Sequence, residues 1–350
     1  MAVSRIDEAG LNINQYGNRN IIINGGMKVA QRGTQTNQAG GYTACDRWQF
    51  VENGNSVVTT SQDTDVPSGH GFANSLKIDV TTASGTPSST NYALLRTKFE
   101  GQDVQHLRYG TSSAKQLTLS FWVKSSKTGT HYAELVHSDA GYYNSIAYTV
   151  SSANTWENKV ITFNGYQTTA FDDDNNNSFQ VYFWLMTGSD YGGGTHTANT
   201  WHNTEANRVV GQVNVMDSTS NNFYLTGVQM EVGTEATPFE HRSFGDELAR
   251  CQRYFQIIAG GVGIGASSTS IETSFTRKEM RAAPSGAATG TVKFEDPTVA
   301  NYTQSSGSVS ITTASARSEK CQFNNFSGLT STRSYFMKSD SGLLALDAEL

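Results

Sequence analysis

The stretch "ATPFEHRSFGDELARCQRYFQ", residues 236–256, decides how this chain is divided. It follows a long series of strand patterns and polar loops, and its second half predicts a helix. Ser243 is a candidate N-cap, and the acidic residues Asp246 and Glu247 favour the first turn of a helix. Apolar side chains recur at helical spacing at Phe244, Leu248, Cys251 and Phe255. Residues 243–256 therefore predict a short amphipathic helix that connects two other parts of the chain.

Alternating strand patterns lie on both sides of this connector. In "QLTLSFWVKSS" one face carries Leu117, Leu119, Phe121 and Val123, and in "SFQVYFWLMTG" one face carries Phe179, Val181, Phe183 and Leu185. Strands do not alternate with helices, so a parallel sheet is not expected. The patterns predict an all-β chain with an N-terminal arm (1–20), a β-sandwich (21–242), the connector helix (243–256) and a second, smaller β-sandwich-like domain (257–350).

The composition excludes several classes of protein. The chain has 350 residues, of which 16% are charged and 11% aromatic, which fits a folded chain with two domains. A net charge of −6 argues against a nucleic-acid partner, and no apolar run is long enough to predict a membrane span. The first residues lack the apolar core of a signal peptide, so folding in a cytoplasm is expected. Three widely spaced cysteines predict buried thiols and neither a disulfide framework nor a zinc site.

No sequence motif for catalysis appears. The chain contains no nucleophile elbow, zinc-protease motif, phosphate-binding loop or EF-hand, so we expect no enzymatic activity. A glycan-degrading depolymerase stays open as an alternative, because such an enzyme needs only two carboxylates at a fixed separation. The seven histidines lack metal-ligand spacing and are expected to be exposed on loops and strands.

The acidic stretch "FDDDNNNSF" contains the one candidate for a metal site. Asp172, Asp173 and Asp174 offer carboxylate oxygens, which calcium prefers, but they lack the spacing of a calcium loop. We therefore expect a solvated turn and no cofactor, with a structural Ca²⁺ ion at these three residues as the alternative.

The second faces of two strands carry unexpected aromatic side chains. Trp122 lies opposite the apolar face of its strand, and so do Tyr182 and Trp184 on theirs. A loop or the connector helix, a neighbouring subunit, or a stacked glycan could cover such a face. The long loop at residues 187–208 is a second candidate binding region, with Tyr191 and Trp201 in a polar setting. These five residues are therefore candidates for binding either a glycan or a neighbouring subunit.

Four stretches of this chain carry a resemblance to a known family: "YLTGVQMEVGTEATPFEHRSFGDELARCQRYFQ", "NIIINGGMKVAQRGT", "YTACDRWQF" and "FEGQDVQHLRYGTSSAKQLTLSFWVKSSKTGT". They resemble segments of structural and tail-fibre-type proteins of tailed bacteriophages, especially marine ones. The shorter "RAAPSG" and the terminal "LALDAEL" extend it loosely into the C-terminal part. It covers most of residues 20–256 closely and points to no single position on a phage particle.

This resemblance implies a fold, a location and a function. The first β-sandwich would be a jelly roll similar to carbohydrate-binding modules, carried on the virion as a homotrimer after assembly in the host cytoplasm. The implied function is that of a tail-fibre-like adhesin that attaches to a host-surface glycan or receptor, without catalysis. A capsid or tail decoration protein with a purely structural role is the alternative. The arm at residues 1–20 would attach the protein to other virion proteins.

Overall fold

The structure, a computed structural model, describes residues 18–350 apart from 290, 299, 305–308, 315–317 and 339–342. The chain forms two compact units, Met1–Glu247 and Leu248–Leu350. The division between them falls inside helix α3 (Phe244–Gln252). Most of the predicted arm, residues 1–17, lies outside the described residues, so its role in attachment stays a prediction.

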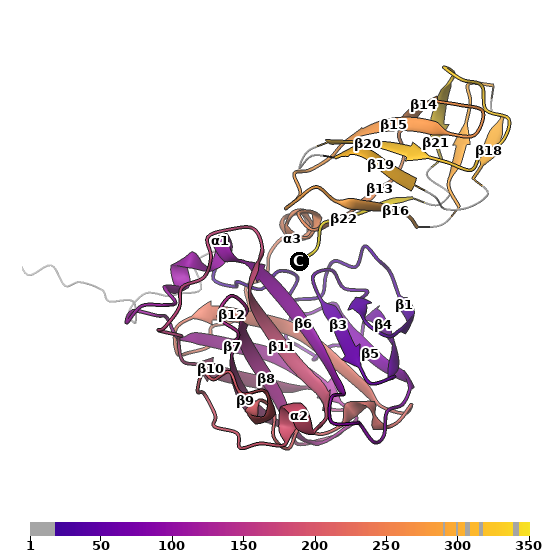
Figure 1. The fold of residues 1–350 in the computed structure, drawn as a ribbon. Coiled ribbons are helices and arrows are strands. Elements are labelled where there is room, and N and C mark those ends of the chain that lie inside the picture. The colour runs from indigo at the N-terminus through magenta and orange to yellow at the C-terminus, as the bar shows by residue number, and fades with distance from the viewer. Residues whose placement is uncertain (1–17, 290, 299, 305–308, 315–317, 339–342) are drawn as a thin grey trace, which may run out of the picture. The chain divides into compact units, whose positions relative to one another are not determined.

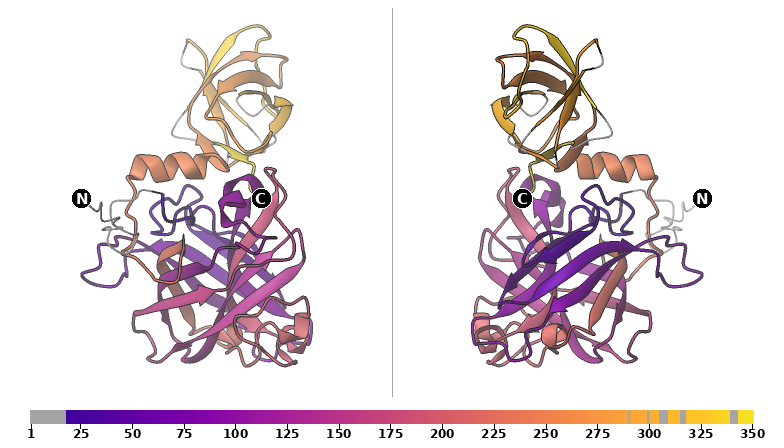
Figure 2. Two further views of the ribbon diagram at one scale, coloured as in Figure 1. Left: turned by 90° about the vertical axis from the view of Figure 1, so that its left-hand side faces the viewer. Right: turned by 90° about the vertical axis from the view of Figure 1, so that its right-hand side faces the viewer.

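The first unit is a jelly-roll sandwich of two antiparallel six-stranded sheets, as Figures 1 and 2 show from three sides. The first sheet has the strand order β1 (Gln35–Gln38), β4 (Val57–Asp63), β5 (Ser75–Thr82), β12 (Asn222–Val232), β7 (Leu117–Ser125) and β10 (Glu157–Phe163). The second sheet has the order β2 (Gly41–Tyr42), β3 (Gln49–Asn53), β6 (Tyr92–Glu100), β11 (Asn177–Thr187), β8 (Gly129–His137) and β9 (Tyr142–Val150). The predicted all-β jelly-roll fold is confirmed.

One face of each sheet builds the core between the two layers. The predicted inward residues Leu117, Leu119, Phe121 and Val123 of β7 are all 0% exposed, and so are Phe179, Val181, Phe183 and Leu185 of β11. The pairing register of strand β11 with β6 shifts between Asn177 and Phe179 and again between Trp184 and Met186, and the second shift interrupts the alternation of the strand. Met186 therefore joins the core beside Leu185, although strict period-2 alternation would place it on the same face as Trp184.

The connector helix is shorter than predicted. Helix α3 begins after Ser243, whose Oγ accepts a hydrogen bond from the Asp246 amide, as expected of an N-cap. It ends at Gln252, because a turn follows and Phe255 already belongs to strand β13 (Phe255–Ile258). The other helices among the described residues are single turns: α1 (Gly101–Val104), α2 (Ser189–Gly192), η3 (Gln105–Leu107), η4 (Glu205–Asn207) and η5 (Val215–Asp217). Within the described part of the chain, no helix combines the length and apolar character that crossing a bilayer requires.

The second unit is a smaller sandwich of two sheets with its own core. The larger sheet has the order β18 (Asn301–Thr303), β17 (Lys293–Glu295), β21 (Ser334–Met337), β14 (Val262–Gly265), β15 (Ile271–Thr276), β20 (Ser318–Phe323) and β19 (Val309–Ala314). The smaller sheet joins β13, β22 (Leu344–Asp347) and β16 (Ser285–Ala288). Cys251 and Cys321 are buried in this unit and Cys45 in the first, so the prediction of buried thiols is confirmed.

Two histidines are buried, and the expectation that all seven would be exposed is wrong. His131 and His137 on β8 are both 0% exposed. The His131 ring stacks on Tyr148, with its Nε2 atom 3.1 Å from the Lys127 carbonyl oxygen, and the Nε2 atom of His137 lies 3.0 Å from the Thr169 carbonyl oxygen. Each ring therefore fills core volume and reaches one backbone acceptor, which a strand position alone does not reveal.

We expect His131 to make the stability of the first unit depend on pH. Burial lowers its pKa from 6.5 to about 4, because the apolar surroundings disfavour the charged imidazolium. The unfolded chain binds this proton more readily, so stability falls as the pH drops from about 6.5 to about 4, by about 3 kcal/mol. Urea unfolding at several pH values, with His131→Gln as the comparison, measures this contribution. Identical pH profiles for the two proteins would contradict it.

Candidate functional site

A groove of about 830 Å³ lies on the outer face of the first sheet. Strands β7 and β10 form its floor, and two other segments form its walls: the loop at residues 69–72 and residues 236–241, which follow β12. We call residues 236–241 the strap. The groove thus combines the exposed face of a sheet with part of the stretch that divides the chain, and its volume falls within the range of typical ligand sites.

Trp122 is the aromatic centre of the groove floor. Its neighbours Phe121 and Val123 point into the core, so Trp122 points outward, level with Thr226 on β12 and Asn158 on β10. The ring of His70 packs against the indole of Trp122, with 4.3 Å between ring centroids. Trp122 is only partly buried, which leaves indole surface open to the groove.

A glycine in β12 makes room for the aromatic wall. Gly227 has a φ of +61° and lies where the pairing of β12 with β7 shifts between Thr226 and Gln229. A Cβ atom at this position would lie 2.6 Å from the Phe72 ring, so a larger residue would displace that ring. Phe72 packs in turn against Phe239 of the strap, at 5.0 Å between ring centroids. The bulge at Gly227 therefore determines where Phe72 of the 69–72 loop contacts Phe239 of the strap.

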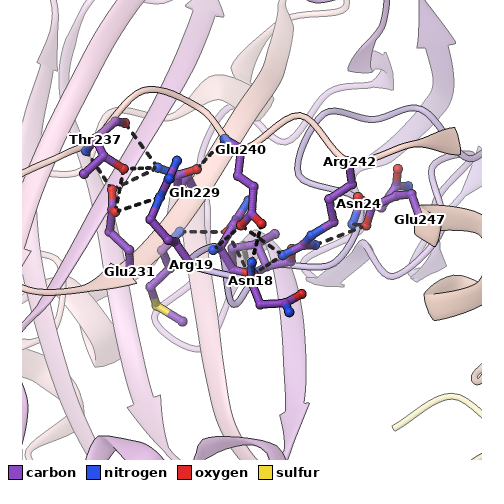
Figure 3. Close-up of polar contacts among 12 residues, drawn as sticks. Asn18, Arg19, Asn24, Gln229, Glu231, Thr237, Glu240, Arg242 and Glu247 are labelled. Atoms are coloured by element: carbon purple, nitrogen blue, oxygen red, sulfur yellow. Dashed lines mark hydrogen bonds and ion pairs between the residues drawn. The ribbon is translucent and has the colours of Figure 1, made fainter. Parts of the chain in front are cut away.

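Buried polar side chains of β12 hold the strap in place, as Figure 3 shows. The Glu231 carboxylate accepts hydrogen bonds from the Thr237 amide at 2.8 Å and from the Thr237 hydroxyl at 2.7 Å. The side-chain oxygen of Gln229 accepts one from the Glu240 amide at 2.8 Å. Gln229 is 0% and Glu231 4% exposed, and their polar atoms are satisfied by the strap and by a hydrogen bond from Gln229 to Glu231.

The start of the described chain holds the strap from its other side. The Glu240 carboxylate accepts hydrogen bonds from the backbone amides of Asn18 and Asn20 (Figure 3). Arg242 donates to the carbonyl oxygens of Asn20 and Ile22 and lies 3.6 Å from the Glu247 carboxylate. The strap is therefore fixed between two segments that are more than two hundred residues apart in sequence.

The groove presents aromatic rings together with free polar atoms. The Ser120 hydroxyl, the Trp122 indole nitrogen and the ring nitrogens of His70 and His241 make no hydrogen bond to any described residue. Burial and the nearby charge of Lys28 lower the pKa of His241, which favours its neutral form. The described lining residues include no Asp, Glu, Lys or Arg. An uncharged molecule with apolar faces and several hydroxyl groups matches this lining.

Three of the predicted residues meet instead on the outer face of the second sheet. Tyr182, Trp184 and Tyr191 line a cavity of about 160 Å³, which is much smaller than the groove. Trp184 is 1% exposed, and the Tyr191 ring lies 5.8 Å from it. A loop or the connector helix, a neighbouring subunit and a glycan were the three possible covers of this face. In the structure, the long loop at residues 187–208 lies over Trp184. Binding of a ligand or a subunit at these residues stays a prediction.

A buried ion pair lies beneath that loop. Glu134, whose side chain is 0% exposed, accepts two hydrogen bonds from the Arg208 guanidinium and one from the Trp184 indole. Burial alone would lower the pKa of Arg208, but the carboxylates of Glu134 and Glu205 outweigh it and raise that pKa. The guanidinium also stacks over the Tyr143 ring at 3.8 Å. This arrangement holds the end of the loop on the sheet.

The remaining predicted residues lie in neither the groove nor the cavity. Trp201 is half-buried, packs against Tyr109 and Tyr166, and donates its indole hydrogen to the Asn164 carbonyl. In the acidic stretch, the Asp174 carboxylate accepts a hydrogen bond from the Asn176 amide, and the Asp172 amide donates to Asp139. Among the described residues, no three His, Cys, Asp or Glu side chains gather as metal ligands. Calcium at Asp172, Asp173 and Asp174 stays a prediction.

Sequence reasoning found Trp122 but missed the walls of the groove. His70, Phe72, Phe239 and His241 come from loops, where periodicity gives no signal. The local hint in the sequence is Phe239 and His241 in "TPFEHR", directly before the connector helix, but no periodic pattern places these two side chains on a face.

Comparisons with known proteins give weak likenesses. No family model and no curated protein matches the sequence. Among solved structures, the enzymatically active domain of bacteriophage CBA120 tailspike protein 4 is 15% identical with a TM-score of 0.34, over 61% of this chain and 22% of that chain. A family 11 carbohydrate-binding module from Clostridium thermocellum, in complex with a mixed-linked tetrasaccharide, is 12% identical with a TM-score of 0.29, over 55% of this chain and 91% of that one. TmCBM61 with galactotriose is 10% identical with a TM-score of 0.33, over 61% and 99%. Because these identities and TM-scores are low, the assignment of the fold rests on the strand order of this chain and not on the likenesses.

Proposed function

We propose that this protein is an adhesin that binds a neutral oligosaccharide in the groove between the 69–72 loop and the strap. The observation that carries the proposal is the partly exposed indole of Trp122 among polar atoms that have no partner in the described chain. Because the groove is open along its floor, an extended ligand can enter it from the side. A closed cavity would not admit such a ligand.

The chemistry of a sugar fits both features of the groove. The C–H groups on one side of a pyranose ring carry slight positive charge and pack against the negative face of an aromatic ring. Its hydroxyl groups can exchange hydrogen bonds with the Ser120 hydroxyl, the Trp122 indole nitrogen and the two histidine rings. Because the lining side chains are uncharged, a neutral glycan loses less hydration energy on binding than an acidic one.

The location on a phage virion is a further part of the proposal. It is supported by the resemblance of residues 20–256 to tail-fibre-type virion proteins, described above on the quoted stretches. Single glycan sites of this kind bind weakly, and several copies on one particle would raise the avidity without new contacts. Attachment through residues 1–20 and a homotrimeric state belong to the same proposal.

Glycan-array binding of the full chain tests the site. We expect Trp122→Ala to weaken binding to the best glycan by about 30-fold, which corresponds to about 2 kcal/mol. Trp156→Ala is the matched control, because it removes another half-buried tryptophan of the first unit that lines neither the groove nor the cavity, and it should leave the affinity unchanged.

Three outcomes would overturn the proposal in different ways. Loss of binding in Tyr191→Ala, but not in Trp122→Ala, would move the site to the cavity on the second sheet. Absence of any bound glycan would favour a purely structural decoration protein. Release of reducing sugar from a bound glycan would show a depolymerase.

A further inference from the structure

The cavity on the second sheet has an arginine at one end of its floor. Strands β3, β6 and β11 lie side by side and form this floor (Figure 1), and the volume of the cavity is about 160 Å³. Tyr92, Leu94 and Arg96 alternate along β6 and all line the cavity, so Arg96 lies at one end of the floor and Tyr92 at the other. Arg96 pairs with Tyr182 across the sheet, and its guanidinium carbon lies 5.9 Å from the centroid of the Tyr182 ring. The cavity therefore joins a cationic end to an aromatic one.

The protein itself uses the Arg96 guanidinium only in part. Its Nε atom donates to the side-chain oxygen of Gln49 at 2.8 Å, and its Nη1 atom lies 3.3 Å from the side-chain oxygen of Gln180 and 3.3 Å from the Tyr182 hydroxyl. Its Nη2 atom makes no hydrogen bond to any described residue, and no described carboxylate forms an ion pair with it. Every hydrogen-bond partner of this half-buried cation in the described chain is therefore neutral, and the Nη2 hydrogens are left for another molecule.

Two tyrosine hydroxyls at the other end of the cavity are also available to a ligand. The rings of Tyr92 and Tyr191 lie 5.2 Å apart, and neither hydroxyl makes a hydrogen bond to any described residue. Burial raises the pKa of Tyr191, so its hydroxyl keeps its proton at neutral pH and can donate. Trp184 between them and Arg96 offers only its ring, because its indole nitrogen already donates to Glu134. The cavity therefore presents a charged donor at one end and two neutral hydroxyls at the other, with aromatic faces between them.

The charges around the cavity limit the charge of a ligand. Arg208 also lines the cavity, but its guanidinium is already paired with Glu134 and Glu205. Arg96 is therefore the one lining cation without an acidic partner in the described chain. Glu205 lines the same space, so a doubly charged anion would meet more repulsion there than a singly charged one. A carboxylate fits, because it carries a single charge and its two oxygens match the parallel N–H groups of Nη1 and Nη2.

We propose that the cavity binds one sugar ring that carries a carboxylate, as in a hexuronic acid, with the carboxylate at Arg96 and ring hydroxyls at Tyr92 and Tyr191. A volume of about 160 Å³ corresponds to about five water molecules at about 30 Å³ each, which suits one ring and not two. The C–H face of the ring packs against the aromatic side chains, and its hydroxyls accept hydrogen bonds from the two phenols. A small carboxylate without a ring would leave both phenols unused. Tyr191 is half-buried and Glu205 is exposed, so the cavity opens to solvent on the side of the long loop.

This site does not depend on the groove. The cavity and the groove share no lining residue, and they lie on the outer faces of different sheets. The described groove lining is uncharged and suits neutral sugars, whereas the guanidinium of Arg96 selects for an acidic one. Each of the two sites can therefore be tested, and can fail, without the other.

NMR titration of the full chain with hexuronic acids tests the site. D-glucuronate, D-galacturonate and D-mannuronate are each compared with the neutral hexose of the same configuration. We expect at least one uronate to bind about tenfold more tightly than its neutral counterpart and than acetate. Arg96→Gln should remove this advantage, and Arg96→Lys should recover part of it, because lysine keeps the charge but not the planar fork. Arg108→Gln is the matched control, since it makes the same change of charge at an exposed arginine that lines neither the cavity nor the groove.

A second variant separates loss of the site from loss of folding. Tyr191→Phe removes only a hydroxyl that makes no hydrogen bond to the described residues, so it should weaken uronate binding about threefold and leave urea unfolding unchanged. No binding of any of the three uronates, equal binding of a uronate and its neutral hexose, acetate binding as tight as that of the uronate, or tighter binding of a hexose phosphate would each overturn the proposal. Loss of uronate binding in Trp122→Ala but not in Arg96→Gln would overturn it as well, because the acid would then lie in the groove. Binding of neutral glycans by the groove is measured separately, so failure of that function and failure of this site are distinguishable.

Discussion

Replacing Arg242 with alanine is expected to lower the free energy of unfolding of the first unit by about 3 kcal/mol. The Arg242 side chain is 7% exposed and lies 3.7 Å from Glu240 and 3.6 Å from Glu247. Without the guanidinium, two mostly buried carboxylates lose their countercharge and two carbonyl oxygens lose their donor. All five tryptophans precede residue 248, so urea unfolding followed by tryptophan fluorescence reports on this unit alone.

If the groove binds a glycan as proposed, the same substitution should weaken that binding about tenfold, because Arg242 follows the strap directly and fixes its end. Arg242→Lys should recover part of the stability but not all of it, since an ammonium group cannot serve both carbonyl oxygens and both carboxylates in one plane. Arg281→Ala, in the second unit, is the control and should leave the fluorescence transition unchanged. An unchanged transition in Arg242→Ala would show that the contacts of Arg242 drawn in Figure 3 contribute nothing to stability.

Glu134→Ala is expected to have a still larger effect, a loss of about 3–5 kcal/mol in the same unfolding experiment. The substitution leaves the guanidinium of Arg208 with Glu205 as its remaining acidic partner and leaves the Trp184 indole without its acceptor. Because the Arg208 side chain is 8% exposed, water cannot replace what is lost. The long loop at residues 187–208 should then detach, and Trp184 fluorescence should shift towards that of an exposed indole.

A double replacement separates burial of charge from packing. Glu134→Leu combined with Arg208→Met removes both charges and keeps most of the apolar volume, so it should be clearly more stable than Glu134→Ala alone. If the double variant is as unstable as the single one, the loop is held by the exact hydrogen-bond geometry and the prediction of an uncompensated charge is wrong.

The strands were predictable because a half-buried strand alternates apolar and polar residues along the sequence. In β7 the inward residues alternate in this way from Leu117 to Val123, and in β11 they do so from Phe179 to Leu185. The alternation fails to predict the position of Met186, because a bulge in the strand moves this residue to the other face. It also fails for His131 and His137, because a histidine on a strand can be either buried or exposed and the sequence does not distinguish the two. Strand order was not predictable, because it depends on contacts between residues far apart in the chain.

The groove could be predicted only in part, for the same reason. Trp122 is visible from its own strand, since it is a large aromatic residue on the face that should be polar. Its surroundings arise from Gly227, which permits the bulge, and from the strap, which folds back onto β12 through Gln229 and Glu231. No local sequence pattern specifies these contacts. The strand residue Trp122 on the floor of the groove could therefore be predicted, whereas the loop residues that form the walls could not.

The hydrogen bonds from Asn18 and Asn20 to Glu240 also have a mechanical consequence. Glu240 lies between Phe239 and His241, which both line the groove. Tension applied to the chain at Asn18 would therefore act first on this carboxylate and would load the wall of the groove that carries Phe239 and His241.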